Sequence, residues 1–130
     1  MRNLEDISPR IKAEFLDKYP LLFPNGKLPY CGFYCGVGWF PILQKLCSDI
    51  TKILETLPKE DRTAPVAQVK EKFGSLRWYQ DNIHENVSDE VYALISKAEK
   101  ASSSVCEDCG EPGITTGSGW LRTLCENCSK

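Results

Sequence analysis

The chain has 130 residues, which is the length of one domain with a modest hydrophobic core. Its 16 basic and 18 acidic residues give a net charge of −2, which argues against broad electrostatic binding of nucleic acid or of an anionic membrane. No apolar run is long enough to span a membrane, and the first ten residues lack the apolar stretch of a signal peptide.

Three helices are predicted, in chain order. The first covers residues 8–19, with Ser8 as its N-cap. The second covers residues 39–57, where apolar side chains recur every three or four positions, and it is expected to form the spine of the core. The third covers residues 88–101 and is expected to begin at Ser88.

Between the last two helices, residues 66–81 have the pattern of two strands joined by a tight turn. A glycine followed by a small polar residue, at Gly74 and Ser75, predicts a two-residue loop of the kind that needs glycine first. This loop would place Lys72 opposite Arg77 across the hairpin. The face towards the core would then hold Val69, Phe73, Leu76 and Trp78.

The other face of this hairpin is predicted to be basic, because it carries Lys70, Lys72, Arg77 and Tyr79. Like charges directly opposed across two strands are mildly destabilising. Lys72 opposite Arg77 is therefore explained if an anionic partner covers this face. The alternative is that acidic side chains of the neighbouring loops, at 59–62 or 81–90, neutralise it.

The last 25 residues contain two Cys-x-x-Cys pairs, formed by Cys106, Cys109, Cys125 and Cys128. Four thiolates in two such pairs are typical of a tetrahedral zinc site, and we expect one Zn²⁺ per chain. A strand–turn–strand pattern at 114–124 would bring the pairs together as a zinc-ribbon-like knuckle. Because four cysteines leave no open position for water, the zinc is expected to be structural. The alternatives are two disulfides or four unligated thiols, which an odd total of 7 cysteines disfavours.

The other potentially reactive side chains do not form a recognisable catalytic pattern. Cys31, Cys35 and Cys47 are expected to be buried as small apolar residues, and a second metal site that includes His84 is the alternative. His84 is the single histidine and is expected to be a solvated side chain in a loop. The Gly36-Val37-Gly38 stretch matches a phosphate-binding loop only in its first three residues. We therefore expect no enzymatic activity.

Together these elements predict an α+β fold, with about three helices packed on a small antiparallel hairpin or sheet and a C-terminal zinc-ribbon-like knuckle. The α+β domain would cover residues 1–103, and the knuckle, 104–130, would pack on it. The knuckle has a side-chain charge of −2, and four thiolates with one Zn²⁺ add a further −2. This acidity also argues against nucleic acid as a partner.

The order of motifs over roughly residues 31–128 resembles an uncharacterised family of small proteins encoded by tailed bacteriophages and prophages. The motifs that carry the resemblance are Cys-Gly-Val-Gly-Trp-Phe at 35–40, Val-Lys-Glu-Lys-Phe-Gly-Ser-Leu-Arg-Trp-Tyr at 69–79, Cys-Glu-Asp-Cys-Gly-Glu-Pro-Gly at 106–113 and Gly-Trp-Leu-Arg-Thr-Leu-Cys at 119–125. The resemblance implies an accessory phage gene whose product works in the bacterial cytoplasm.

The expected function is that of a small, non-enzymatic, phage-encoded zinc protein that binds a host protein and inhibits it, for example in counter-defence. One alternative is that it sequesters an anionic small molecule such as a signalling nucleotide. Another is weak binding of nucleic acid, which the charge makes the least favoured partner. No membrane partner is expected, and the sequence leaves the oligomeric state open. The residues expected to bind the partner or ligand are Lys70, Lys72, Arg77, Tyr79 and Trp120.

Overall fold

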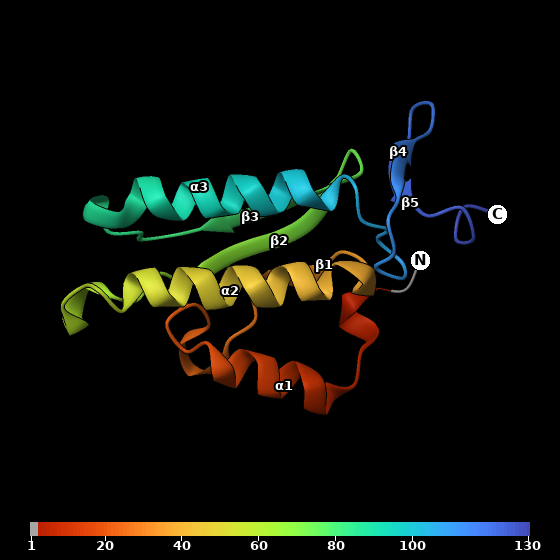
Figure 1. Ribbon diagram of the computed structural model, residues 1–130. Coiled ribbons are helices and arrows are strands. Elements are labelled where there is room, and N and C mark those ends of the chain that lie inside the picture. The colour runs from red at the N-terminus through yellow and green to blue at the C-terminus, as the bar shows by residue number, and fades with distance from the viewer. Residues whose placement is uncertain (1–2) are drawn as a thin grey trace.

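Three helices and a three-stranded sheet form two layers in the computed structural model, which describes residues 3–130 (Figure 1). The helices are α1 (Pro9–Lys18), α2 (Phe40–Leu54) and α3 (Glu85–Ser102). The strands of the main sheet are β1 (Tyr30–Tyr34), β2 (Val66–Lys72) and β3 (Ser75–Gln80), and a separate hairpin contains β4 (Ile114–Thr116) and β5 (Arg122–Leu124). Short 3₁₀ helices cover Leu4–Asp6, Pro24–Gly26, Val37–Trp39 and Lys59–Asp61. The predicted α+β class with three helices is confirmed.

Helices α1 and α3 begin at residues whose side chains accept a capping hydrogen bond from the backbone. In α1 the Ser8 hydroxyl accepts a hydrogen bond from the Arg10 backbone N–H at 3.3 Å, so the predicted N-cap is confirmed. The prediction for α3 was wrong at its start. Its N-cap is His84, whose Nδ1 accepts from the Asn86 N–H at 3.1 Å, so the helix begins three residues before the expected cap, Ser88. His84 thus lies in the loop before α3, as predicted, but it has a role that was not predicted, because it caps the helix.

The main sheet has the strand order β1-β2-β3, with β1 parallel to β2 and β2 antiparallel to β3. Strand β1 lies in a segment where the sequence pattern predicts no strand. A bulge explains this error, because Cys31 (φ 62°) and Gly32 (φ 68°) interrupt the ladder between Tyr30 and Phe33. The bulge breaks the alternation by which a strand is recognised in a sequence, and the parallel pairing with β2 is visible only in the fold.

The β2–β3 turn differs by one residue from the prediction. Its two loop residues are Phe73 and Gly74, with φ of 55° and 81°, which is the pair of positive φ angles that a type I′ turn requires. Lys70 therefore lies opposite Arg77, and the expected pairing of Lys72 with Arg77 is wrong. Phe73 is 62% exposed at the tip of the hairpin, so it is not part of the core as predicted.

The core lies between the sheet and the layer formed by α2 and α3, which both cover one face of the sheet (Figure 1). Its largest fully buried apolar side chains include Trp39, Phe23, Phe33, Leu43, Ile50 and Leu76. Helix α1 packs against the same core through Phe15, whose ring centroid lies 5.1–5.6 Å from those of neighbouring aromatic rings, Phe40 among them. None of the helices in the part of the chain that is described is long and apolar enough to cross a membrane.

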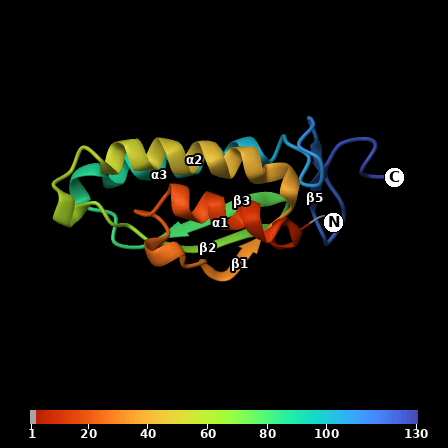
Figure 2. The same cartoon turned by 90° about the horizontal axis from the view of Figure 1, so that it is seen from below.

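The outer edge of β3 is covered by side chains of α3. The Ser102 hydroxyl accepts from the Leu76 N–H, and a Glu99 carboxylate oxygen accepts from the Trp78 N–H, both at 2.8 Å. These contacts satisfy backbone donors that an edge strand would otherwise expose. The face of the sheet that points away from α2 and α3 carries no helix (Figure 2).

Candidate functional site

Four cysteine side chains meet beside the β4–β5 hairpin. The Sγ atoms of Cys106, Cys109, Cys125 and Cys128 all lie within 4.8 Å of one another, and none of them forms a disulfide. Ligands at about 2.3 Å from a tetrahedral zinc ion would lie about 3.8 Å apart. The distance from Cys109 Sγ to Cys125 Sγ is 3.6 Å. The predicted clustering is confirmed, and the donor set suits one tetrahedral metal ion.

The local structure explains why the two pairs meet. Strands β4 and β5 pair antiparallel with Thr115 opposite Thr123, so the pair before β4 is brought beside the pair after β5. The first pair closes a turn in which the Gly110 N–H donates to the Cys106 carbonyl at 2.9 Å. Gly110 has φ 87°, a conformation that glycine adopts without a steric penalty.

The four thiols differ in how easily they lose a proton. Burial raises the pKa of Cys106, but hydrogen bonds from the backbone of Cys125, Cys109 and Asp108 outweigh burial and lower this pKa to about 6. The Cys125 side chain is the main cause that raises the pKa of Cys128 to about 12. A divalent cation that binds all four sulfurs must displace protons from the weaker acids, so metal affinity falls as the pH falls.

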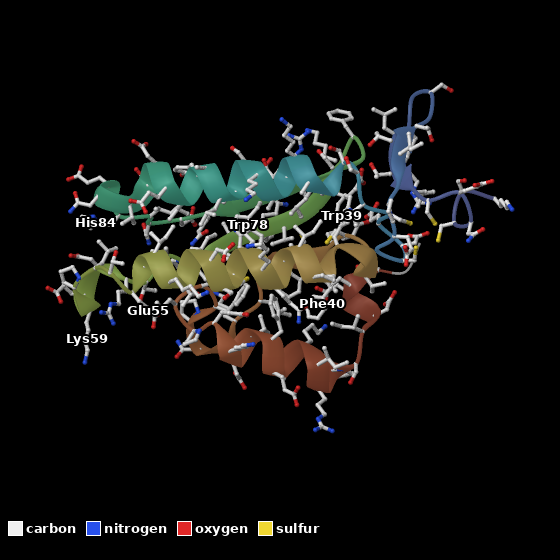
Figure 3. All side chains as sticks on the ribbon, viewed as in Figure 1. Trp39, Phe40, Glu55, Lys59, Trp78 and His84 are labelled. Carbon is white, nitrogen blue, oxygen red and sulfur yellow. The ribbon has the colours of Figure 1, made fainter. Side chains whose placement is uncertain are left out.

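The cysteine cluster is attached to the core through the start of α2. Cys106 is completely buried. The Gly38 N–H donates to the Glu107 carbonyl at 2.7 Å, and the Trp39 indole N–H donates to the Val105 carbonyl at 2.8 Å. Figure 3 shows Trp39 at the end of α2 that faces the C-terminal segment. The segment that carries the first cysteine pair is thus part of the same packed unit as α2.

Gly36 and Gly38 are required by this close approach of two backbones. A Cβ at Gly38 would lie 2.6 Å from the Glu107 carbonyl oxygen and from the Gly110 nitrogen, and still closer to the Cys106 carbonyl oxygen. A Cβ at Gly36 would overlap the backbone and side chain of Glu107 in the same way. The glycine pair therefore serves packing against the cysteine segment, which sequence reasoning did not detect.

Glu107 is a buried acid that the sequence reveals only as one of the charges of the knuckle. Its side chain is fully buried, and one carboxyl oxygen accepts from the Gly36 N–H at 2.9 Å while the other has no partner within residues 3–130. Burial is the main cause that raises the pKa of Glu107 to about 7. The sequence offers no signal for this difference, because Asp108 is adjacent and yet pairs with Arg122 at 3.1 Å.

The remaining cysteines do not build a second centre. Cys35 and Cys47 are fully buried, as expected, and burial raises the pKa of both thiols. Cys31 is exposed, contrary to the expectation. His84 lies at the end of α3 far from the C-terminal segment (Figure 3). Within residues 3–130 the four-cysteine cluster is the only group of three or more potential ligands that is close enough to share an ion.

The uncovered face of the main sheet carries tyrosines and cations. We call it the open sheet face and define it by Tyr30, Tyr34, Gln68, Lys70, Lys72, Arg77 and Tyr79. Tyr34, Lys70 and Arg77 form one row across the three strands, and Tyr30, Gln68 and Tyr79 form the next. The three tyrosines are 75%, 60% and 47% exposed in chain order. Four of the five predicted binding residues thus share one surface.

The three cations of the open sheet face form no salt bridge within the described chain, although Arg77 lines one hollow together with Glu99 of α3. Within residues 3–130, no carboxylate oxygen lies within 4.0 Å of Lys70, Lys72 or Arg77. Arg77 also keeps a buried Nε atom without a hydrogen-bond partner among these residues. Lys70 Nζ lies 5.6 Å from the centroid of the Tyr79 ring, close enough for a cation–π contact. No ion pair therefore links this face to the loops at 59–62 and 81–90 within residues 3–130.

Trp120, the fifth predicted binding residue, lies beside the tip of the β2–β3 hairpin. It is 76% exposed and lines a shallow groove together with Lys72 and Phe73. The hairpin tip is held there because the Thr123 hydroxyl donates to the Gly74 carbonyl at 2.5 Å.

Comparison with known proteins gave no matching family model, no matching curated protein and no matching solved structure.

Proposed function

We propose that the protein binds one structural zinc ion through its four clustered cysteines and acts by binding an anionic partner at the open sheet face. It would then be a binding protein and not an enzyme. The resemblance to phage-encoded proteins leads us to expect the partner in a bacterial host cell.

The zinc part of the proposal is supported by the donor set and by its connections. Four thiols within 4.8 Å of one another can fill a tetrahedral coordination shell, which leaves no position open for a substrate or water. The same segment contacts the start of α2 through Val105 and Glu107. Zinc would therefore stabilise both the β4–β5 hairpin and its attachment to the core.

We expect purified protein to contain one zinc ion per chain by elemental analysis. In a thiol-reactivity assay on the native protein, exposed Cys31 should react quickly, and buried Cys35 and Cys47 slowly. The four ligand thiols should react only after a chelator removes the metal. A metal-free protein, or disulfides among these four cysteines, would contradict the zinc assignment.

The binding part of the proposal is carried by one observation: three unpaired cations and three exposed tyrosines share a face that no helix covers. Lys70 and Arg77 are direct neighbours across β2 and β3, which is unfavourable unless an anion is present. The guanidinium of Arg77 has a planar set of donors that fits a carboxylate or a phosphate. An anion at this position would relieve the repulsion between the two cations.

Arg77→Glu and Lys52→Glu form a matched pair for testing this surface. Both change the net charge equally, but Lys52 is exposed on α2, away from the open sheet face. We expect the unmodified protein to be retained on immobilised heparin in low salt, Arg77→Glu to flow through and Lys52→Glu to be retained. Equal loss of retention in both variants, or no retention of the unmodified protein, would contradict the proposed surface.

A further inference from the structure

The chemistry of the open sheet face narrows the class of its anionic partner. Resting on the proposed function, we infer that the partner is single-stranded nucleic acid, with bases stacked on Tyr30, Tyr34 and Tyr79 and phosphates held by Lys70, Lys72 and Arg77. The net charge of the chain argued against nucleic acid, but net charge does not report where the cations lie.

The tyrosines provide stacking surfaces at suitable positions. Tyr30 and Tyr79 lie in one row on either side of Gln68, so their backbones are two strand spacings apart, about 9.6 Å. Tyr34 projects from the neighbouring row on β1. A ring whose face is open to solvent can stack on a base of any sequence, and each such contact is worth about 1–3 kcal/mol.

The cations lie between and beside these rings, where they can contact the phosphates of a nucleic-acid strand whose bases stack on the rings. Lys70 is in the central strand next to Tyr34, and Arg77 follows in the same row. The Gln68 side chain, between Tyr30 and Tyr79, presents both an amide donor and an acceptor that can meet the edge of a base. The arrangement thus combines rings, phosphate-binding donors and one base-reading group on one face.

The same face is less suited to duplex DNA than to a single strand, and an acidic protein is the main competing partner. Its side chains are tyrosines, basic residues and a glutamine. Tyrosine and arginine are also common at protein interfaces, so an acidic protein is the competing occupant that the test must exclude. Duplex DNA is read by a helix or a two-stranded ribbon that enters a groove, whereas the open sheet face is formed by three paired strands and carries no helix. A single strand leaves its bases free to stack on the rings.

Towards the hairpin tip the aromatic surface continues beyond the sheet. Phe73 and Trp120 are 62% and 76% exposed and line one groove with Lys72 and with Glu71, whose carboxylate accepts from the Gly74 N–H. A strand bound over Tyr30 and Tyr79 could extend along β2 to this groove. The surface would then cover the span from Gln68 to Lys72, about 13 Å along the strand.

The test measures binding of a fluorescein-labelled 15-nucleotide oligo-dT and oligo-U by anisotropy, using the full zinc-loaded chain. We expect saturable binding, with a slope of log affinity against log salt of about −2 for three phosphate contacts. Tyr79→Ala should weaken binding by about 5-fold to 150-fold, whereas Tyr79→Phe, which keeps the ring, should bind nearly as well as the unmodified protein. Tyr92→Ala is the matched control, because Tyr92 is 53% exposed on α3, outside the open sheet face.

Three outcomes would overturn the inference. The first is no binding of either oligonucleotide. The second is equal binding of a 15-base-pair duplex with no effect of Tyr79→Ala, which would indicate phosphate contacts alone. The third is a stronger response to poly-glutamate than to the oligonucleotides, which would indicate an acidic protein partner. The heparin experiment separates failure of this inference from failure of the proposed function. If Arg77→Glu still abolishes retention on heparin and Lys52→Glu does not, the proposed function stands even when one of these three outcomes is observed.

Discussion

Gly38→Ala is expected to destabilise the protein by about 3 kcal/mol and to weaken metal binding at the same time. The added Cβ would lie 2.6 Å from the Glu107 carbonyl oxygen and from the Gly110 nitrogen. Both are backbone atoms of the segment that holds Cys106 and Cys109, so no side chain can rotate away to make room. Either α2 or the cysteine segment must move, and the hydrogen bond from the Gly38 N–H to Glu107 would be lost.

The matched control is Gly119→Ala in the β4–β5 loop. A Cβ at Gly119 meets nothing within 4 Å, and the substitution is penalised only because φ is 83°, at a cost of about 1 kcal/mol. Chemical denaturation should report the difference in the free energy of unfolding, and competition with a chelator should report the metal affinity. Equal stability of the two variants would show that the two backbones are not packed as closely as described.

Cys109→Ser is expected to remove the metal and to disorder the C-terminal segment from about residue 111 onwards. Cys109 is exposed, so its side chain adds little to the core, and any large effect must come through the ion. The free energy of metal binding in small zinc sites is about 10–16 kcal/mol, and the short strands β4 and β5 bury little apolar surface that could replace it. Because Trp39 and Gly38 contact this segment, loosening should also reach the first turn of α2.

Hydrogen exchange followed by mass spectrometry measures both effects. Protection should be lost in β4 and β5 and lowered at the start of α2, while β2 and β3 stay protected. Cys31→Ser is the control, since Cys31 is also exposed but is not a ligand. A C-terminal segment that remains protected in Cys109→Ser would show that the hairpin folds without a metal.

Periodicity in the sequence was sufficient to identify the helices. The apolar repeat of α2 and the Ser8 cap of α1 are local features, and local features persist in the fold. The start of α3 was misassigned because a histidine ring nitrogen accepts the capping hydrogen bond, whereas Ser88, the more familiar capping residue, lies inside the helix. Both histidine and serine can accept the hydrogen bond of an N-cap, and only the backbone conformation shows which of the two residues does so.

Strand pairing was predicted less well, because it joins residues that are distant in the chain. The bulge at Cys31 and Gly32 conceals β1, and a one-residue difference in the turn changed which cations are opposed. The basic character of the face nevertheless survived the change in register, because Lys70, Lys72 and Arg77 keep the same parity along their strands. Tyr30 and Tyr34 lie on this face because β1 pairs in parallel with β2, which the sequence did not predict.

The sequence by itself determined the α+β composition, the helical segments and the four cysteines that cluster, because helix periodicity and Cys-x-x-Cys spacing act over a few residues. The tertiary structure decided which backbone segments touch. It buried Glu107 beside Gly36, made Gly36 and Gly38 sterically necessary and assembled the open sheet face from three strands. Such contacts join residues up to 71 positions apart, and their energies depend on burial and exact approach, which no local pattern encodes.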